Sequence, residues 1–312
     1  MKFFKPRFWD KKQISFFSII LFPLSLLIQL LNFLKSITIK RKSFPIPVIC
    51  IGNIYVGGTG KTPLCIELYN ILKKLEKNPV FIRKKHKKYE DEKKLLEQFG
   101  QVYENSNRIN SLDNAIKNKF DIAVMDDGFQ DHSVKKDFSI ICFNEKQWIG
   151  NGLTIPSGPL REKLTSLNRA NCVVINGKKN NNIENKILDK NKLIKIYYTQ
   201  YIPENINNFK NRKIICFAGI GNPENFFDML KMNEINILDQ IKFPDHYNYS
   251  QKELEDLKKK AKENNAILLT TEKDYLRINK EHRDKINYLK LMVEMEKKNE
   301  FIEQIKKLYE NR

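Results

Sequence analysis

The feature that most constrains this chain is a glycine-rich turn set between a strand pattern and a helix pattern. The apolar run Pro45–Ile51 predicts a short buried strand. The segment Val56–Pro63 follows and contains three glycines and a Lys-Thr pair. Apolar residues then recur at helical spacing from Leu64 to Leu75. A strand, a glycine turn and a helix in this order predict a phosphate-binding loop on a parallel α/β sheet.

The residue types in this turn suit a nucleoside triphosphate. Glycines let backbone N–H groups point inward around phosphate oxygens, and the start of the following helix adds a favourable dipole. A lysine in this frame reaches the β- and γ-phosphates, and a threonine hydroxyl ligates Mg²⁺. The pattern departs from the usual one at Tyr55, where a glycine would be expected. The residues predicted to bind the nucleoside triphosphate are Gly57, Gly58, Thr59, Gly60, Lys61 and Thr62.

The amino-terminal run Ile14–Leu34 carries no charge and is long enough for a membrane-spanning helix. Pro23 lies in its middle and would kink or break such a helix. In a helix, the polar members of the run fall on one narrow stripe. These members are Ser15, Ser18, Ser25, Gln29 and Asn32. Basic residues flank the run and could meet anionic headgroups. The pattern favours a helix in the membrane interface over a spanning helix, with a secretory signal or a buried helix pair as alternatives.

Further apolar runs alternate with helical patterns, which is typical of a parallel α/β sheet. They are Val80–Ile82, Phe120–Met125, Ser139–Phe143 and Cys172–Ile175, and a second α/β unit begins at Lys213–Ala218. We therefore predict an α/β fold with a P-loop NTPase-like parallel sheet domain, a second, smaller α/β domain and an amino-terminal membrane-associated helical segment. The predicted ranges are 1–42 for that segment, 43–205 for the P-loop domain and 206–312 for the carboxyl-terminal domain.

The pair Asp126-Asp127 closes one of these strand patterns, as the Walker-B aspartate of P-loop enzymes does. Adjacent carboxylates repel each other unless a cation lies beside them, and Mg²⁺ would supply that cation. A solvated turn is the alternative, since Asp-Asp-Gly is also good turn chemistry. A membrane-associated switch ATPase or GTPase would share these features. A GTPase also needs an Asn-Lys-x-Asp guanine reader, and Thr271–Asp274 has the wrong order.

The charge balance predicts a basic surface. The chain has 56 Lys and Arg against 37 Asp and Glu, a net charge of +19. Such a surface attracts nucleic acid, anionic lipid or phosphorylated substrates. No zinc pattern, basic heptad helix or RNA-recognition signature supports a nucleic-acid partner, and no protein partner is predicted. The five widely spaced cysteines predict buried free thiols in a reducing compartment.

Short blocks along the chain, in the same order, resemble the tetraacyldisaccharide 4'-kinase family. The blocks are Gly52-Asn53 with Gly57–Pro63, Asp126–Gln130, Gly150–Gly152, Pro156–Glu162, Phe243–Tyr247 and Thr270–Asp274. The apolar amino-terminal segment, with Phe8-Trp9 before it, fits the same family. The resemblance covers nearly the whole chain. It implies a kinase that uses ATP and Mg²⁺ to phosphorylate the 4'-hydroxyl of tetraacyldisaccharide 1-phosphate in lipid A biosynthesis. It also implies a peripheral or monotopic protein on the cytoplasmic face of the inner membrane. A kinase of the same fold with another acceptor is the remaining alternative.

The resemblance also implies roles for single residues. It matches Asp91 to the family's catalytic base and His246 to the histidine that partners the base, which suits a sugar hydroxyl that needs a positioned proton acceptor. The expected catalytic set is Asp91, His246, Asp127 and Arg161. The expected metal set is Thr62, Asp126, Asp127 and Glu162. Arg108 and Asn53 are expected to contact the substrate. The basic cluster Lys84–Lys88 replaces a glycine-rich family block, and it is either solvated or contacts headgroups or the substrate's 1-phosphate.

Overall fold

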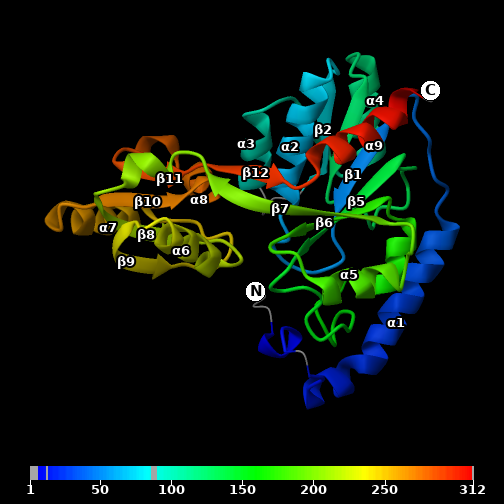
Figure 1. Cartoon of the computed structure of the whole chain (residues 1–312), viewed down its shortest axis with the longest axis horizontal. Coiled ribbons are helices and arrows are strands. Elements are labelled where there is room, and N and C mark those ends of the chain that lie inside the picture. Colours follow the sequence, from blue (N-terminus) through cyan, green and yellow to red (C-terminus); the bar gives the residue numbers. More distant parts are fainter. Residues whose placement is uncertain (1–5, 12, 86–89, 311–312) are drawn as a thin grey trace. The chain divides into compact units, whose positions relative to one another are not determined.

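The computed structural model describes residues 6–11, 13–85 and 90–310. The chain divides into two compact units (Figure 1). The first unit comprises residues 1–85, 102–200 and 294–312, and the second comprises residues 86–101 and 201–293. The prediction of an α/β fold with a parallel sheet and one apolar amino-terminal helix is confirmed. Residues 86–88 of the basic cluster Lys84–Lys88 lie outside the described residues.

The first unit is built on an eight-stranded sheet in the order β12-β7-β6-β5-β1-β4-β2-β3. The strands from β7 to β3 in that order pair in parallel. The bounds are β1 Val48–Gly52, β2 Pro79–Lys84, β3 Val102–Asn105, β4 Ile122–Asp126, β5 Phe138–Asn144, β6 Cys172–Asn176, β7 Lys195–Pro203 and β12 Leu291–Met295. In the β1–β4 pair, Ile51 lies level with Asp126. The loops that follow β1 and β4 therefore begin side by side, at the edge where α/β proteins bind ligands.

Helices cover both faces of this sheet. Alternate residues of a strand point to opposite sides, so a single strand contacts helices on both faces. On one face, Ile82 of β2 shares a core with Leu112 of α4 and Ile187 of α5. On the other face, Phe81 of β2 stacks on Tyr69 of α2 with ring centroids 4.6 Å apart. The helices are α2 Lys61–Lys74, α4 Arg108–Lys117 and α5 Asn181–Leu188. Burial on both faces explains why the strands read as continuous apolar runs.

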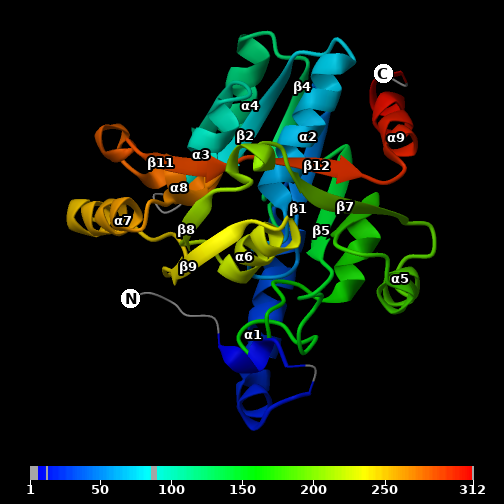
Figure 2. The same ribbon diagram turned by 60° about the vertical axis from the view of Figure 1, so that its left-hand side comes forward.

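The second unit has a four-stranded parallel sheet in the order β11-β10-β8-β9, with helices on both faces (Figure 2). Cys216 of β8 packs with Phe227 of α6, and Phe217 packs with Leu257 of α7. The bounds are β8 Lys213–Ala218, β9 Asn236–Lys242, β10 Ile267–Thr271, β11 Ile286–Leu289, α6 Pro223–Met232 and α7 Gln251–Glu263. Short 3₁₀ helices are η1 Arg7–Trp9, η2 Leu164–Arg169, η3 Ile206–Phe209 and η4 Lys280–His282.

The two units differ from the predicted domain ranges at two helices and at the predicted segment 1–42, which groups with the first unit. Helix α3 (Glu90–Glu97) groups with the second unit, because it packs on α8 (Glu272–Arg277). Helix α9 (Lys298–Glu310) groups with the first unit, because its Phe301 packs edge-to-face on Tyr197 of β7. Both contacts join residues that are far apart in the chain, so no local sequence pattern predicts them.

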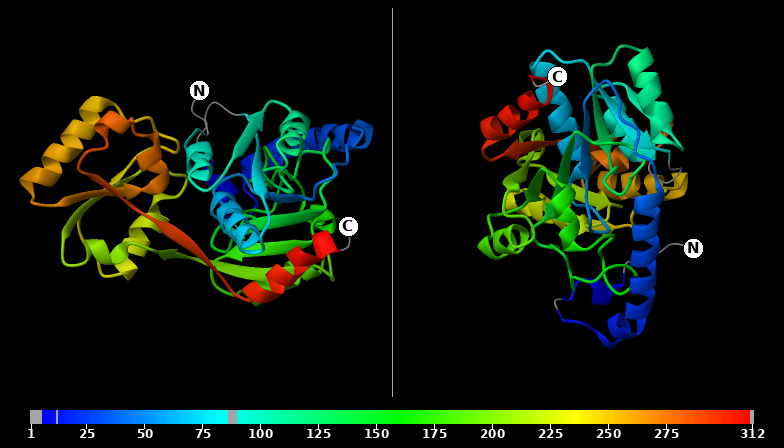
Figure 3. Two further views of the ribbon diagram at one scale, coloured as in Figure 1. Left: turned by 90° about the horizontal axis from the view of Figure 1, so that it is seen from above. Right: turned by 90° about the vertical axis from the view of Figure 1, so that its right-hand side faces the viewer.

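The amino-terminal helix α1 (Phe16–Thr38) is continuous through Pro23 (Figure 3). Of the predicted kink or break at this proline, the break is therefore wrong, although a proline still removes one backbone hydrogen bond. Polar contacts on both sides of it hold the helix to the first unit. Ser18 Oγ accepts from Asn151 Nδ2 at 3.1 Å, and Ser25 Oγ donates to the Thr154 carbonyl at 3.0 Å.

Three members of the predicted polar stripe, Ser18, Ser25 and Gln29, contact the loop of residues 151–157, whereas Asn32 is exposed. Ser25 also bonds Ser157 Oγ at 2.8 Å, and Gln29 Nε2 donates to Thr154 Oγ1 at 2.7 Å. Most large apolar side chains of α1 stay exposed, from 41% at Phe22 to 72% at Phe16, whereas Leu21 and Ile28 are half-buried. Among the described residues, α1 is the one helix long and apolar enough to cross a membrane.

Candidate active site

The glycine turn after β1 adopts a conformation that only glycine takes readily. Gly57 has φ +138° and Gly60 has φ +92°, and helix α2 begins directly after it at Lys61. A Cβ added at Gly58 would meet no atom within 4 Å, so space is open over the turn. These features agree with a loop that admits phosphate oxygens close to its backbone.

The side chain of Asn53 stabilises this loop through hydrogen bonds. The side chain is fully buried, and its Nδ2 donates to Thr59 Oγ1 at 2.9 Å and to the Gly57 carbonyl at 3.3 Å. The carbonyl of Asn53 accepts from Gln130 Nε2 at 2.9 Å. Asn53 therefore supports the nucleotide loop, and the predicted contact with the substrate stays a prediction.

Tyr55 occupies the position where the usual pattern has glycine. Its side chain is fully buried, and its hydroxyl donates to Asp10 Oδ1 at 2.6 Å. The neighbouring Trp9 is also buried and donates from Nε1 to the Pro156 carbonyl at 3.0 Å. The glycine loop is thereby packed against the segment that leads into α1.

The Tyr55→Gly variant, which restores the usual glycine pattern, is expected to destabilise the protein by roughly 3 kcal/mol or more. The reason is that it empties the volume of a buried aromatic ring. Thermal unfolding should reveal a midpoint lower by roughly 6 °C or more. Tyr55→Phe is the matched control, because it loses only the hydrogen bond, about 1 kcal/mol. Equal unfolding midpoints for Tyr55→Gly and wild type would show that the ring does not support the loop.

The two predicted metal-site aspartates end β4 and have different partners. Asp126 is buried, and its Oδ2 lies 3.1 Å from Arg83 Nε. Asp127 has φ +49°, an uncommon conformation for a residue other than glycine. Its carboxylate accepts from Arg161 NH1 at 2.9 Å and lies 3.7 Å from Lys61 Nζ. Burial opposes ionisation of Asp127, but Lys61 and Arg161 lower its pKa to about 2. Asp127 is therefore a carboxylate at neutral pH.

Arg108 fixes the backbone of the same turn. Its NH2 donates to the carbonyls of Asp126 and Asp127 at 3.2 and 2.9 Å, and its NH1 lies 3.0 Å from Asp131 Oδ2. The side chain is buried. A buried arginine on two successive carbonyls stabilises the strained turn at Asp127. The predicted contact of Arg108 with the substrate stays a prediction.

The predicted metal ligands present oxygen atoms, which Mg²⁺ prefers. Thr62 is the second residue of α2, Asp126 is the last residue of the adjacent strand β4, and Asp127 follows it. Glu162 pairs with Arg169 through Oε2. Its Oε1 is buried, and no hydrogen-bond partner for it exists within residues 6–11, 13–85 and 90–310. A buried acceptor of this kind fits a cation ligand. The donor types therefore suit Mg²⁺, although within the described part of the chain no three His, Cys, Asp or Glu side chains are grouped closely enough to hold a metal ion by themselves.

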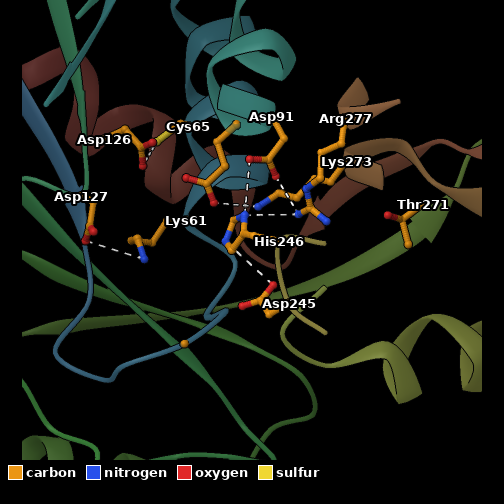
Figure 4. A network of polar contacts seen from close by, with 12 residues as sticks. Lys61, Cys65, Asp91, Asp126, Asp127, Asp245, His246, Thr271, Lys273 and Arg277 are labelled. Carbon is orange, nitrogen blue, oxygen red and sulfur yellow. Dashed lines mark hydrogen bonds and ion pairs between the residues drawn. The ribbon is translucent and has the colours of Figure 1, made fainter. Parts of the chain in front are cut away.

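A second cluster of site residues lies in the second unit, around Asp91 of α3 (Figure 4). Asp91 Oδ1 lies 3.4 Å from His246 Nδ1, and Oδ2 accepts from Arg277 NH2 at 2.8 Å. The structure thus brings together the predicted base and its predicted histidine partner. Burial raises the pKa of Asp91, but His246, Arg277 and Lys273 outweigh burial and lower the pKa below its usual range.

Three partners of these carboxylates were not predicted as site residues. They are Arg83 beside Asp126, and Arg277 and Lys273 near Asp91. For Arg277 a local signal existed, since Asp274 lies three residues earlier and the two pair within helix α8. The pairing of Arg277 with Asp91 had no such signal.

The chain resembles known proteins along almost its full length. A sequence model described as Tetraacyldisaccharide-1-P 4'-kinase matches residues 17–84 and 76–310. The tetraacyldisaccharide 4'-kinase of Pelagibacter ubique (strain HTCC1062) is 42% identical over 313 aligned positions, covering 99% of each chain. That of Rickettsia bellii (strain OSU 85-389) is 36% identical over 296 positions, covering 89% of this chain and 90% of the relative.

A solved structure has the same fold. LpxK from Aquifex aeolicus, crystallised in complex with ATP, superimposes with a TM-score of 0.72 at 22% identity. The match covers 94% of this chain and 99% of that one. At this level of identity the likeness concerns the fold.

Proposed function

This chain belongs to the tetraacyldisaccharide 4'-kinase family, and we propose that it transfers the γ-phosphate of ATP to the 4'-hydroxyl of tetraacyldisaccharide 1-phosphate in lipid A biosynthesis. The observation that carries the proposal is the glycine loop. Gly57 and Gly60 have the φ angles of a phosphate cradle, and Lys61 stands at its end beside Asp127. A kinase needs these features, and a protein that only bound the lipid would not.

We propose that Lys61 and Arg161 stabilise the transferred phosphoryl group. Negative charge spreads over its equatorial oxygens in the transition state, so cations placed there lower the barrier. In the structure both side chains contact Asp127, and bound ATP would offer them phosphate oxygens. Thr62, Asp126, Asp127 and Glu162 would hold Mg²⁺, which when bound neutralises charge on the β- and γ-phosphates.

We propose that Asp91 is the general base. It accepts the proton of the 4'-hydroxyl as the new bond between that oxygen and the γ-phosphorus forms. The bond between the γ-phosphorus and the oxygen that bridges it to the β-phosphate breaks, and ADP leaves with that electron pair. His246 lies 3.4 Å from Asp91 and orients the carboxylate.

The test of this function is transfer of the γ-phosphate from labelled ATP to tetraacyldisaccharide 1-phosphate in mixed micelles with Mg²⁺. We expect a labelled product with this acceptor and none with its 4'-deoxy analogue. ATP binding without transfer to the lipid would refute this acceptor and favour another one. If the protein does not bind ATP, the kinase assignment is refuted.

We further propose that α1 holds the enzyme on a membrane, on the cytoplasmic face of the inner membrane where ATP is available. Its polar stripe is bonded to the body of the first unit, so the exposed apolar sides face outward. A helix tied along one side suits a monotopic protein in the interface better than a free spanning helix.

The Leu27→Glu, Leu31→Glu double variant is expected to bind anionic phospholipid vesicles at least about 30-fold more weakly than wild type. Both leucines are at least half exposed, so the fold should tolerate the change, while roughly 2 kcal/mol of apolar burial in lipid is lost. Co-sedimentation with the vesicles measures the effect. Leu193→Glu with Met232→Glu is the control, since both residues are exposed outside α1. Equal binding by the α1 variant and wild type would exclude docking through α1.

A further inference from the structure

The segment Thr270–Asp274 lies at the centre of a polar network in the second unit. Asp274 is fully buried. Its Oδ2 accepts from Gly219 N at 3.1 Å and from Thr271 Oγ1 at 2.6 Å. Its Oδ1 accepts from the Tyr249 hydroxyl at 2.8 Å. This carboxylate is therefore fixed by residues from three separate segments of the second unit.

Arg277 connects this fixed carboxylate to Asp91. Its NH1 donates to Asp274 Oδ1 at 2.7 Å and to the Gly219 carbonyl, and its NH2 donates to Asp91 Oδ2 at 2.8 Å. The Arg277 side chain is 6% exposed and that of Asp91 is 1% exposed. Figure 4 shows the guanidinium turned toward Asp91 and His246. A planar guanidinium can bridge two carboxylates in one fixed geometry, which a lysine cannot do.

The two oxygens of Asp91 therefore have different surroundings. Oδ2 is occupied by Arg277, whereas Oδ1 lies 3.4 Å from His246 Nδ1. The adjacent pair Glu92 and Lys273, 2.8 Å apart, joins the same two helices, so α8 holds α3 at two successive residues. These contacts hold the side chain of Asp91 in one orientation.

We propose that Arg277 is a positioning residue for the reaction: it holds Oδ2 of Asp91, so that Oδ1 is the oxygen that accepts the proton of the acceptor hydroxyl. The proposal rests on the proposed role of Asp91 as base. It also gives the segment Thr270–Asp274 a function, because Asp274 fixes Arg277 and Lys273 fixes α3.

The decisive experiment is a double-mutant cycle with Asp91→Asn, Arg277→Gln and the protein that carries both changes, assayed for kcat with saturating ATP and lipid. A residue that acts only through Asp91 has no further effect once Asp91 is gone. We expect Arg277→Gln to lower kcat about 30-fold or more in the wild-type background and less than twofold in the Asp91→Asn background. The ATP dissociation constant should stay within twofold. An equal loss in both backgrounds would overturn the proposal.

The pH dependence of kcat gives an independent readout. The charged groups around Asp91 are Glu92 on α3, Lys273 and Arg277 on α8, and His246, with Asp245 beside His246 and Asp274 beside Arg277. Arg277→Gln removes a cation that favours the carboxylate, so the pKa of Asp91 rises. The loss of activity on the acid side should then begin about one pH unit or more higher. Arg277→Lys keeps the charge and should keep the acid limb within half a unit of wild type, with kcat about tenfold lower.

Controls separate the possible failures. Arg212→Gln removes an exposed arginine from the same unit and should match wild type. If Arg277→Gln is too unstable to assay, Arg277→Lys replaces it in the double-mutant cycle. Wild-type turnover by Asp91→Asn would overturn the proposed base itself. If Asp91→Asn loses turnover while a folded Arg277→Gln enzyme keeps wild-type kcat and pH dependence, only the positioning role is overturned.

Discussion

Replacing Lys61 with alanine is expected to lower kcat/KM for phosphoryl transfer by about 1,000-fold or more. Lys61 is the first residue of α2, and its side chain is mostly buried beside Asp127. Loss of one preorganised donor to a developing charge costs about 100- to 1,000-fold in rate, and ATP binding weakens in addition because the lysine also contacts the ground-state phosphates. Initial rates over a range of ATP concentrations measure both effects.

Lys74→Ala is the matched control for Lys61→Ala. Lys74 ends the same helix with an exposed side chain, so its removal changes the net charge by the same amount without touching the loop. We expect wild-type rates within twofold. A Lys61→Ala enzyme within tenfold of wild type would mean that the glycine loop does not bind the reacting phosphate.

Replacing Asp91 with asparagine is expected to lower kcat by about 100- to 10,000-fold with little change in ATP affinity. General-base catalysis contributes about this factor, and the residues predicted to bind ATP belong to the other unit. Asparagine keeps the shape of the side chain but cannot accept the hydroxyl proton. Single-turnover measurements with bound ATP isolate the chemical step.

The Asp91→Asn change also leaves Arg277 without one of its two carboxylate partners. Breaking a buried ion pair costs roughly 3–5 kcal/mol, so thermal unfolding must be recorded beside the rates. Glu90→Gln is the control, because Glu90 precedes Asp91 and is exposed. A folded Asp91→Asn enzyme with wild-type kcat would require a different proton acceptor.

The arrangement of the glycine loop and the aspartate pair could be predicted because its signals are local. Strand β1, the glycine turn and helix α2 follow one another between Val48 and Lys74, and the aspartate pair directly ends β4. Parallel pairing of β1 with β4 then places the two loops together. Each step needs only strand patterns and the geometry of a parallel sheet.

The supports of the site could not be predicted, because they depend on contacts between distant residues. Arg277 lies 186 residues after Asp91, and Ser25 meets Thr154 across 129 residues. Tyr55 appeared as a departure from a pattern, whereas in the structure its ring fills a buried space beside the amino-terminal segment. The polar stripe of α1 was visible in the sequence, but its partner was not.

Helix α3 is encoded between β2 and β3 of the first unit but completes the second. A ribosome adds roughly 5–20 residues per second, so roughly 10–40 s pass between synthesis of Asp91 and of Arg277, 186 residues later. During that time the growing chain already holds the entire glycine loop. A ribosome halted before Arg277 would therefore display a nascent protein that contains the glycine loop and Asp91 but lacks the arginine that bonds Asp91.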